Sequence, residues 1–168
     1  MTPTTLKPLE LLRREITYDD AIEEEENILQ ESTYPQQRLD LYVYFIRHKI
    51  ELRAIVSRHL GLTGSDTCRV ADVQEWLQGS FNFCIPVYIN NWSKFSRKRV
   101  LLRFPLPYKV GESHFPGNAD EKLRCEASTY VWIQENCADV PVPYLWGFGF
   151  SNGQSVCNKK DCLEFQIC

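Results

Sequence analysis

The spacing of apolar residues in the first third of the chain predicts helices. Between Gln36 and Leu60 they recur at intervals close to three and four residues, as on one face of a helix. The members of this stripe are Leu39, Tyr42, Phe45, Ile46, Ile50, Ile55 and Val56. We therefore predict a helical segment over residues 17–62, in which Gln36–Leu60 is one long helix. Thr17 or Asp19 is the expected N-cap of the first helical element of this segment, and Gly61 is the expected end of the long helix.

Residues 68–104 show a different pattern, in which β-branched and aromatic residues dominate. The segments CRVADVQEWL, FNFCIPVYI and RVLLRF predict three successive strands. The turn QGS separates the first two, and the polar connector NNWSKFSRK separates the second from the third. Strands joined in this way favour an antiparallel meander. A later extended segment, ending in YLWGFGF, predicts a fourth strand.

A helical pattern lies between the loop YKVGESHFPGN and that last strand. ADEKLRCEASTYVWIQENC lacks Gly and Pro, and Asn118 precedes it with Glu121 three residues later, as in a capping box. Together the elements predict an α+β fold with an antiparallel sheet of four or five strands and one packed helix, preceded by the helical segment. The expected divisions are an irregular N-terminus (1–16), the helical segment (17–62), the strand-rich part (68–155) and an atypical tail (156–168).

A permanent cation, Arg103, lies within the otherwise apolar strand VLLRF. Side chains alternate along a strand, so Arg103 and Leu101 share one face. The other face carries Val100, Leu102 and Phe104. Because both faces carry apolar residues, we expect Arg103 on a partly covered surface, where a charge is costly unless it is paired.

The predicted helix contains a matching acid. Its apolar stripe is interrupted at one place, by Glu126; the stripe consists of Ala119, Leu123, Tyr130, Ile133 and Cys137. A carboxylate in a buried stripe needs a cation, and the strand and helix are neighbours in sequence. We therefore predict an ion pair between Arg103 and Glu126, shielded from bulk solvent. The alternatives are a purely structural pair, or a Glu126 that meets Lys122 or Arg124 in water.

The turn between the first two strands is a second candidate feature. In QGSFN, Gly79, Ser80 and Asn82 can direct backbone N–H groups at an anion, although many hairpins have a similar turn. The chain order is strand, glycine turn, strand, strand with a cation, helix with an acid, and strand. This is the arrangement of a protein-kinase N-terminal lobe, where a basic residue held by a helix glutamate binds the nucleotide phosphates.

Four segments resemble the protein-kinase-like family of aminoglycoside phosphotransferases, specifically its fungal branch. They are WLQGSFNFCIPVYI, KRVLLRFPLPYKVGE, NADEKLRCEASTYVWIQENC and DVPVPYLWGFGF, and the resemblance covers about residues 70–154. It implies a kinase-like N-terminal lobe, ATP with Mg²⁺, and phosphoryl transfer to a small-molecule hydroxyl. The residues that it assigns to nucleotide binding are Gly79, Ser80, Phe81 and Asn82 over the phosphates, Arg103 with its orienting Glu126, and Leu101 beside the adenine.

The resemblance stops before the residues that carry catalysis in that family. A His-Gly-Asp loop is typical there, but none of His48, His59 and His114 is followed by Gly-Asp. We therefore expect a truncated phosphotransferase that is inactive alone, has no catalytic or metal-binding residue, and binds ATP weakly or not at all. The alternative is a non-catalytic interaction module. It would bind a protein partner, or a second copy, through the face left for the missing lobe.

Composition narrows the partners and the compartment. Of 168 residues, 43% are hydrophobic, enough for a core, and the net charge of -3 does not favour nucleic acid or an anionic membrane. No apolar window approaches membrane length and the start lacks a signal-peptide pattern, so we expect a cytoplasmic protein without a membrane partner. The irregular spacing of the 7 cysteines argues against a disulfide framework or a zinc site. A metal site in the cysteine-rich tail is a weaker alternative.

Overall fold

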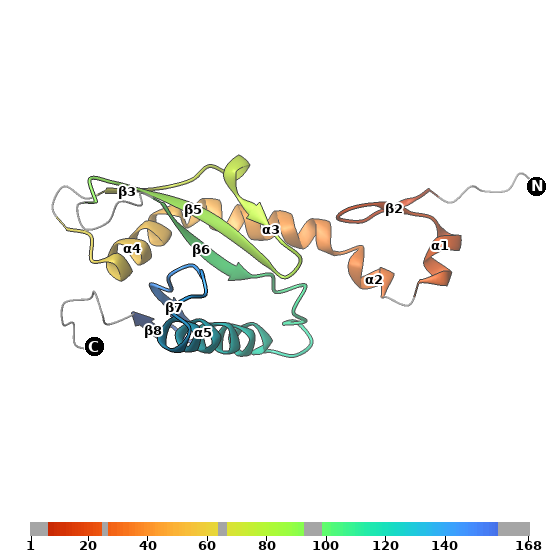
Figure 1. Ribbon diagram of the computed structural model, residues 1–168. Helices are drawn as coiled ribbons and strands as arrows, with labels where there is room; N and C mark the ends of the chain where they lie inside the picture. The colour runs from red at the N-terminus through yellow and green to blue at the C-terminus, as the bar shows by residue number, and fades with distance from the viewer. Residues whose placement is uncertain (1–6, 25–26, 64–66, 93–98, 158–168) are drawn as a thin grey trace, which may run out of the picture. The chain divides into compact units, whose positions relative to one another are not determined.

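The computed structural model describes residues 7–24, 27–63, 67–92 and 99–157. The chain divides into two compact units, residues 1–47 and 48–168 (Figure 1). Both units contain helices and antiparallel strand pairs. This confirms a chain of mixed helix and antiparallel sheet.

The first unit consists of a strand hairpin followed by helices. β1 (Leu9–Glu10) pairs with β2 (Glu15–Ile16), so part of the N-terminus that was expected to be irregular forms strands. α1 (Tyr18–Glu23) follows Thr17, which forms a capping box with Asp20. The remaining helices are α2 (Ile28–Glu31) and α3 (Tyr34–Arg47). The hairpin forms because it buries apolar side chains against α2. The small core of this unit consists of Leu11, Ile16 and Ile28.

The predicted long helix is divided at His48. α3 ends at Arg47 and α4 spans Lys49–Leu60, because His48 has φ -102° and ψ 25°, outside the usual helical range. No Gly or Pro signals this break in the sequence. Gly61 ends α4 in the left-handed conformation, with φ 58°, as predicted.

The second unit is built on a four-stranded antiparallel sheet with β5 (Asn82–Asn90) at its centre. β6 (Arg99–Pro105) pairs with one edge of β5. β3 (Thr67–Val70) and β4 (Leu77–Gln78) pair one after the other with the opposite edge. The second and third predicted strands are therefore confirmed, whereas the first predicted strand is divided into two.

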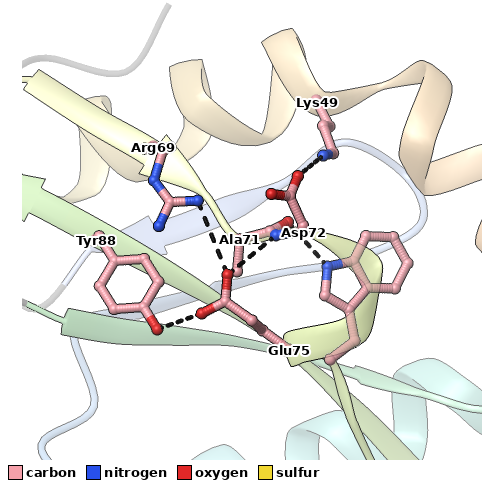
Figure 2. Close-up of polar contacts among 7 residues, drawn as sticks. Lys49, Arg69, Ala71, Asp72, Glu75 and Tyr88 are labelled. Atoms are coloured by element: carbon pink, nitrogen blue, oxygen red, sulfur yellow. Dashed lines mark hydrogen bonds and ion pairs between the residues drawn. The ribbon is translucent and has the colours of Figure 1, made fainter.

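A short 3₁₀ helix, η1 (Val73–Glu75), divides that first strand. Asp72 and Glu75 form a capping box around it. Figure 2 shows how Glu75 is held: Tyr88 donates its hydroxyl to Oε2 at 2.5 Å, and Arg69 Nη1 lies 3.8 Å from Oε1. The hydrogen bond from Tyr88 lowers the pKa of Glu75. These polar contacts fix a turn where strand-forming residues predict a continuous strand.

One face of the sheet carries the core. Alternate residues of β5 are fully buried, and they are Phe83, Ile85, Val87 and Ile89. Cys68 of β3 pairs with Ile89, and its Sγ lies 3.4 Å from Ser57 Oγ of α4. This contact places α4 on the core face. The buried residues of α4 are Leu52, Val56 and Leu60, spaced four apart.

The last predicted strand does not join this sheet. β7 (Gly147–Gly149) pairs with β8 (Ser155–Cys157) in a hairpin of its own. Val156 and Cys157, expected to begin the tail, therefore belong to a strand. The rest of the tail, residues 158–168, lies outside the described residues, as does most of the polar connector before β6.

The helix predicted after β6 is α5 (Asn118–Asn136), but it is not the one packed helix expected, because α4 also packs on the sheet. It begins with a cap that the sequence pattern did not predict. Its N-cap is Gly117, with φ 103°, and Asn118 is already helical, so the capping box expected at Asn118 is wrong. The two carboxylate oxygens of Glu112 instead accept the N–H groups of Gly117 and Ala119, each at 2.7 Å. Glycine reaches this positive φ without strain and lets the preceding loop fold back onto the helix start.

Replacing Glu112 with alanine is expected to lower the free energy of unfolding by about 1–2 kcal/mol, because two amides at the start of α5 lose a charged acceptor. Urea denaturation followed by tryptophan fluorescence measures the change. Glu121→Ala removes the exposed acid of the expected capping box and is the matched control. It should change stability by less than about 0.5 kcal/mol. Equal losses from both variants would contradict the cap assigned to Glu112.

Candidate functional site

The structure brings Arg103 of β6 and Glu126 of α5 together. Arg103 Nη2 donates to Glu126 Oε1 at 3.1 Å. Arg103 pairs with Cys84 of β5, which alternates with the buried core residues. The pair therefore lies on the face of the sheet opposite the core, and α5 covers part of that face. The predicted contact between Arg103 and Glu126 is confirmed.

The pair is less shielded from solvent than expected. The exposed fraction is 41% for the Arg103 side chain and 28% for that of Glu126. The reason is the packing of α5, in which Ala127 is the only buried residue, so the predicted stripe does not seal this face. A pair this exposed contributes only about 0–1 kcal/mol to stability. The exposure of the pair also leaves the Arg103 guanidinium accessible to a ligand.

Glu126 also holds a second cation. Lys122 Nζ contacts the same carboxylate oxygen, Oε1, and 23% of the Lys122 side chain is exposed. The contact with Lys122 thus exists beside the contact with Arg103 and does not replace it. Arg124, the other alternative, has its guanidinium 4.7 Å from the ring centroid of Phe150. Two cations and one carboxylate leave this cluster with one net positive charge, which attracts anions.

Apolar side chains adjoin the ion pair on the same face. The strand register places Cys84 between Leu77 of β4 and Arg103 of β6. Leu77 is 58% exposed, and Leu101, expected beside the cation, is 50% exposed. Burial raises the pKa of the Cys84 thiol; Arg103 opposes this rise and Glu126 adds to it. Leu77, Cys84 and Leu101 form what we call the apolar platform. The pairing of strands, which periodicity alone does not give, was needed to find Leu77 and Cys84.

The glycine turn lies near the same site, because Asn82 pairs with Pro105, two residues beyond Arg103. Gly79 N–H donates to the Asn82 carbonyl at 2.8 Å, so this amide is not directed at an anion as the pattern suggested. Ser80 and Phe81 are exposed, and their N–H groups have no hydrogen-bond acceptor within the described ranges. They are the amides of the turn that can meet a ligand.

The β7–β8 hairpin is attached to α4 and α5. Ser151 donates its N–H and hydroxyl to Asp120 of α5, the latter at 2.7 Å, and these bonds lower the pKa of Asp120. Cys157 Sγ lies 3.2 Å from Nδ1 of His59 on α4. Burial lowers the pKa of His59, and Arg58 adds to the effect. The side chain of His59 thus packs between α4 and the β7–β8 hairpin.

Neither a metal centre nor a membrane segment is found in the part of the chain that the structure describes. Within residues 7–24, 27–63, 67–92 and 99–157, no three His, Cys, Asp or Glu side chains form a group that could hold a metal ion. Cys162 and Cys168 lie outside these ranges, so the metal site suggested for the tail is not tested. No described helix is both long and apolar enough to cross a membrane.

The class of protein that these observations define is a mixed chain of helices and antiparallel sheets. One face of its larger sheet carries an accessible arginine, the carboxylate partner of that arginine and the apolar platform. Comparisons with protein-family models, with curated proteins and with solved structures found no match. The resemblance to aminoglycoside phosphotransferases stays a prediction, based on the four segments that carry it.

Proposed function

We propose that the sheet face carrying Arg103 binds an adenine nucleotide, as the nucleotide-binding half of a kinase-like phosphotransferase. The observation that carries this proposal is the 3.1 Å contact between Arg103 on a strand and Glu126 on the following helix. In kinases such a pair positions a cation on the nucleotide phosphates. The order of the glycine turn, β5, β6 and α5 along the chain also supports it.

The guanidinium has the chemistry and the accessibility that phosphate binding requires. Its planar set of N–H groups can bind a phosphate through two parallel hydrogen bonds. Glu126 fixes its position, and the exposed 41% of the Arg103 side chain leaves it open to a ligand. The N–H groups of Ser80 and Phe81 would add donors from the turn.

The adenine ring would lie against the apolar platform of Leu77, Cys84 and Leu101. Displacing water from these exposed side chains favours binding of a flat apolar ring. The platform covers one side of the ring only, so we expect weak binding by these residues alone. ATP would supply the phosphoryl group, and Mg²⁺ would accompany its phosphates. We assign no magnesium ligand among the described residues.

Transfer of a phosphoryl group needs further residues that position the nucleophile and the metal. We assign neither the positioning of the nucleophile nor that of the metal to residues of the proposed site, so we expect nucleotide binding without turnover from this chain. The second candidate function, a protein-interaction module, draws on the same face. Leu77 and Leu101 are at least half exposed there, as is typical of surfaces that a partner covers.

A titration of the isotope-labelled protein with MgATP into the millimolar range, followed by ¹H–¹⁵N NMR, tests the nucleotide proposal. We expect the amide signals of Ser80 and Phe81 to shift. Arg103→Ala should weaken binding at least about tenfold, because it removes at least one hydrogen bond between charged groups. Glu126→Ala should weaken it by a smaller factor, because the lost orientation of Arg103 is partly offset by removal of a negative charge.

Arg99→Ala is the matched control for this titration. Arg99 is exposed, lies on the same strand and points to the same face, since it pairs with Tyr88 as Arg103 pairs with Cys84. Its loss should change affinity by less than about twofold. Equal binding by the wild type and both site variants would remove the phosphate-binding role. A wild type that shows no shift with MgATP would favour the interaction module.

A further inference from the structure

Two cations, Arg103 and Lys122, meet at one oxygen of Glu126. Arg103 Nη2 lies 3.1 Å from Oε1, and Lys122 Nζ contacts the same atom. Lys122 is the less exposed of the two, at 23% against 41% for Arg103. Lysine side chains are mostly exposed, because the ammonium is strongly hydrated. The position of Lys122 therefore calls for an explanation beyond its pairing within the helix.

The stability of α5 does not supply that explanation. In a helix, a glutamate that precedes a lysine by four residues stabilises more than the reverse order. Here the lysine precedes the glutamate, which is the less favourable arrangement. Even a well-oriented pair of this kind stabilises a helix only slightly. One carboxylate also cannot neutralise both cations.

The cluster has donors for more than one phosphate. A guanidinium carries five N–H groups and an ammonium three, and Glu126 Oε1 accepts one bond from each. A single phosphate would be satisfied by the arginine. Two neighbouring cations of different geometry, one a planar fork and one a point charge, match two phosphates joined to each other.

We propose that Lys122 is a second phosphate-binding residue and that the site takes ligands with at least two linked phosphates, such as a nucleoside diphosphate or triphosphate, in preference to monophosphates. This inference rests on the proposed nucleotide-binding function. It adds a preference among nucleotides and a residue that the resemblance does not assign.

Titrations with ADP and with AMP, followed by NMR as above, test this inference. The wild type should bind ADP at least about fivefold more tightly than AMP. Lys122→Gln should remove most of that preference, by weakening ADP about fivefold while leaving AMP within about twofold. Lys122→Arg keeps the charge and should retain the preference. Arg99→Gln changes the net charge equally from the same sheet face and should leave the preference unchanged.

The outcomes separate this inference from the function on which it rests. If both nucleotides bind in a manner that needs Arg103, and Lys122→Gln weakens them equally or not at all, the inference is wrong and the proposed function stands. If no nucleotide binding depends on Arg103, both fail. Thermal unfolding shows whether each variant folds. Lys122→Met keeps the aliphatic part of the side chain and replaces Lys122→Gln if that variant is unfolded.

Discussion

Replacing Phe83 with alanine is expected to lower the free energy of unfolding of the second unit by about 3–5 kcal/mol. Phe83 is fully buried at the centre of the sheet. Its ring centroid lies 5.9 Å from that of Trp76 and 5.4 Å from that of Phe104, its partner across the strands. Truncation removes both ring contacts and leaves a cavity beside Trp76 and Phe104, which the surrounding strands cannot fill without breaking their register.

Urea denaturation measured by tryptophan fluorescence reports this loss. The 4 tryptophans, at positions 76, 92, 132 and 146, all belong to the second unit, so the signal follows that unit. Phe81→Ala is the control, because Phe81 lies two residues earlier in the turn and is 54% exposed. It should cost less than about 1 kcal/mol. Similar losses from the two variants would mean that Phe83 does not lie in the core.

The strands of the sheet could be predicted where runs of β-branched and aromatic residues contain no internal turn. β5 and β6 lie close to their predicted bounds, because β-branched and aromatic residues, joined by leucine in β6, dominate both segments and their inward-facing side chains are buried in β5 and half-buried in β6. The prediction of one continuous first strand was wrong, because Asp72 and Glu75 cap a short helical turn inside a run of strand-forming residues. The cap that Glu112 forms at the start of α5 was not predicted for a related reason. It depends on a glycine at positive φ and on a loop that folds back, and neither produces a periodic sequence pattern.

The sequence predicts the contact between Arg103 and Glu126, but not the exposure of the pair or its apolar neighbours. Two charges in otherwise apolar elements that follow each other in sequence predict the pair of Arg103 and Glu126, because each charge needs a partner. Its exposure depends on how closely α5 packs against β6, which the stripe on one helix does not determine. The apolar neighbours Leu77 and Cys84 come from the pairing register of β4, β5 and β6. Register is a property of two strands together, so no single segment reveals it.

Gly147→Ala is expected to lower the free energy of unfolding by about 3 kcal/mol, at the upper end for overpacking. A Cβ at this position would lie 2.3 Å from Nδ1 of His59 and 2.6 Å from the backbone oxygen of Val156. The imidazole has little freedom to move, because Cys157 Sγ lies 3.2 Å from the same nitrogen. The strand itself cannot move away without breaking the pairing of β7 with β8. Thermal and urea unfolding measure the loss.

The matched control for Gly147→Ala is Gly149→Ala, two residues further along β7. There a Cβ would meet only atoms at 3.4 Å or more, which the neighbouring residues can accommodate, so the cost should stay below about 1 kcal/mol. A double-mutant cycle with His59→Ala then separates the two obstacles at Gly147. Without the imidazole, the loss caused by Gly147→Ala should shrink but not vanish, because the carbonyl of Val156 still blocks the methyl group. An unchanged loss in the His59→Ala background would show that the ring is not what confines β7, and that the hairpin does not pack on α4 through His59.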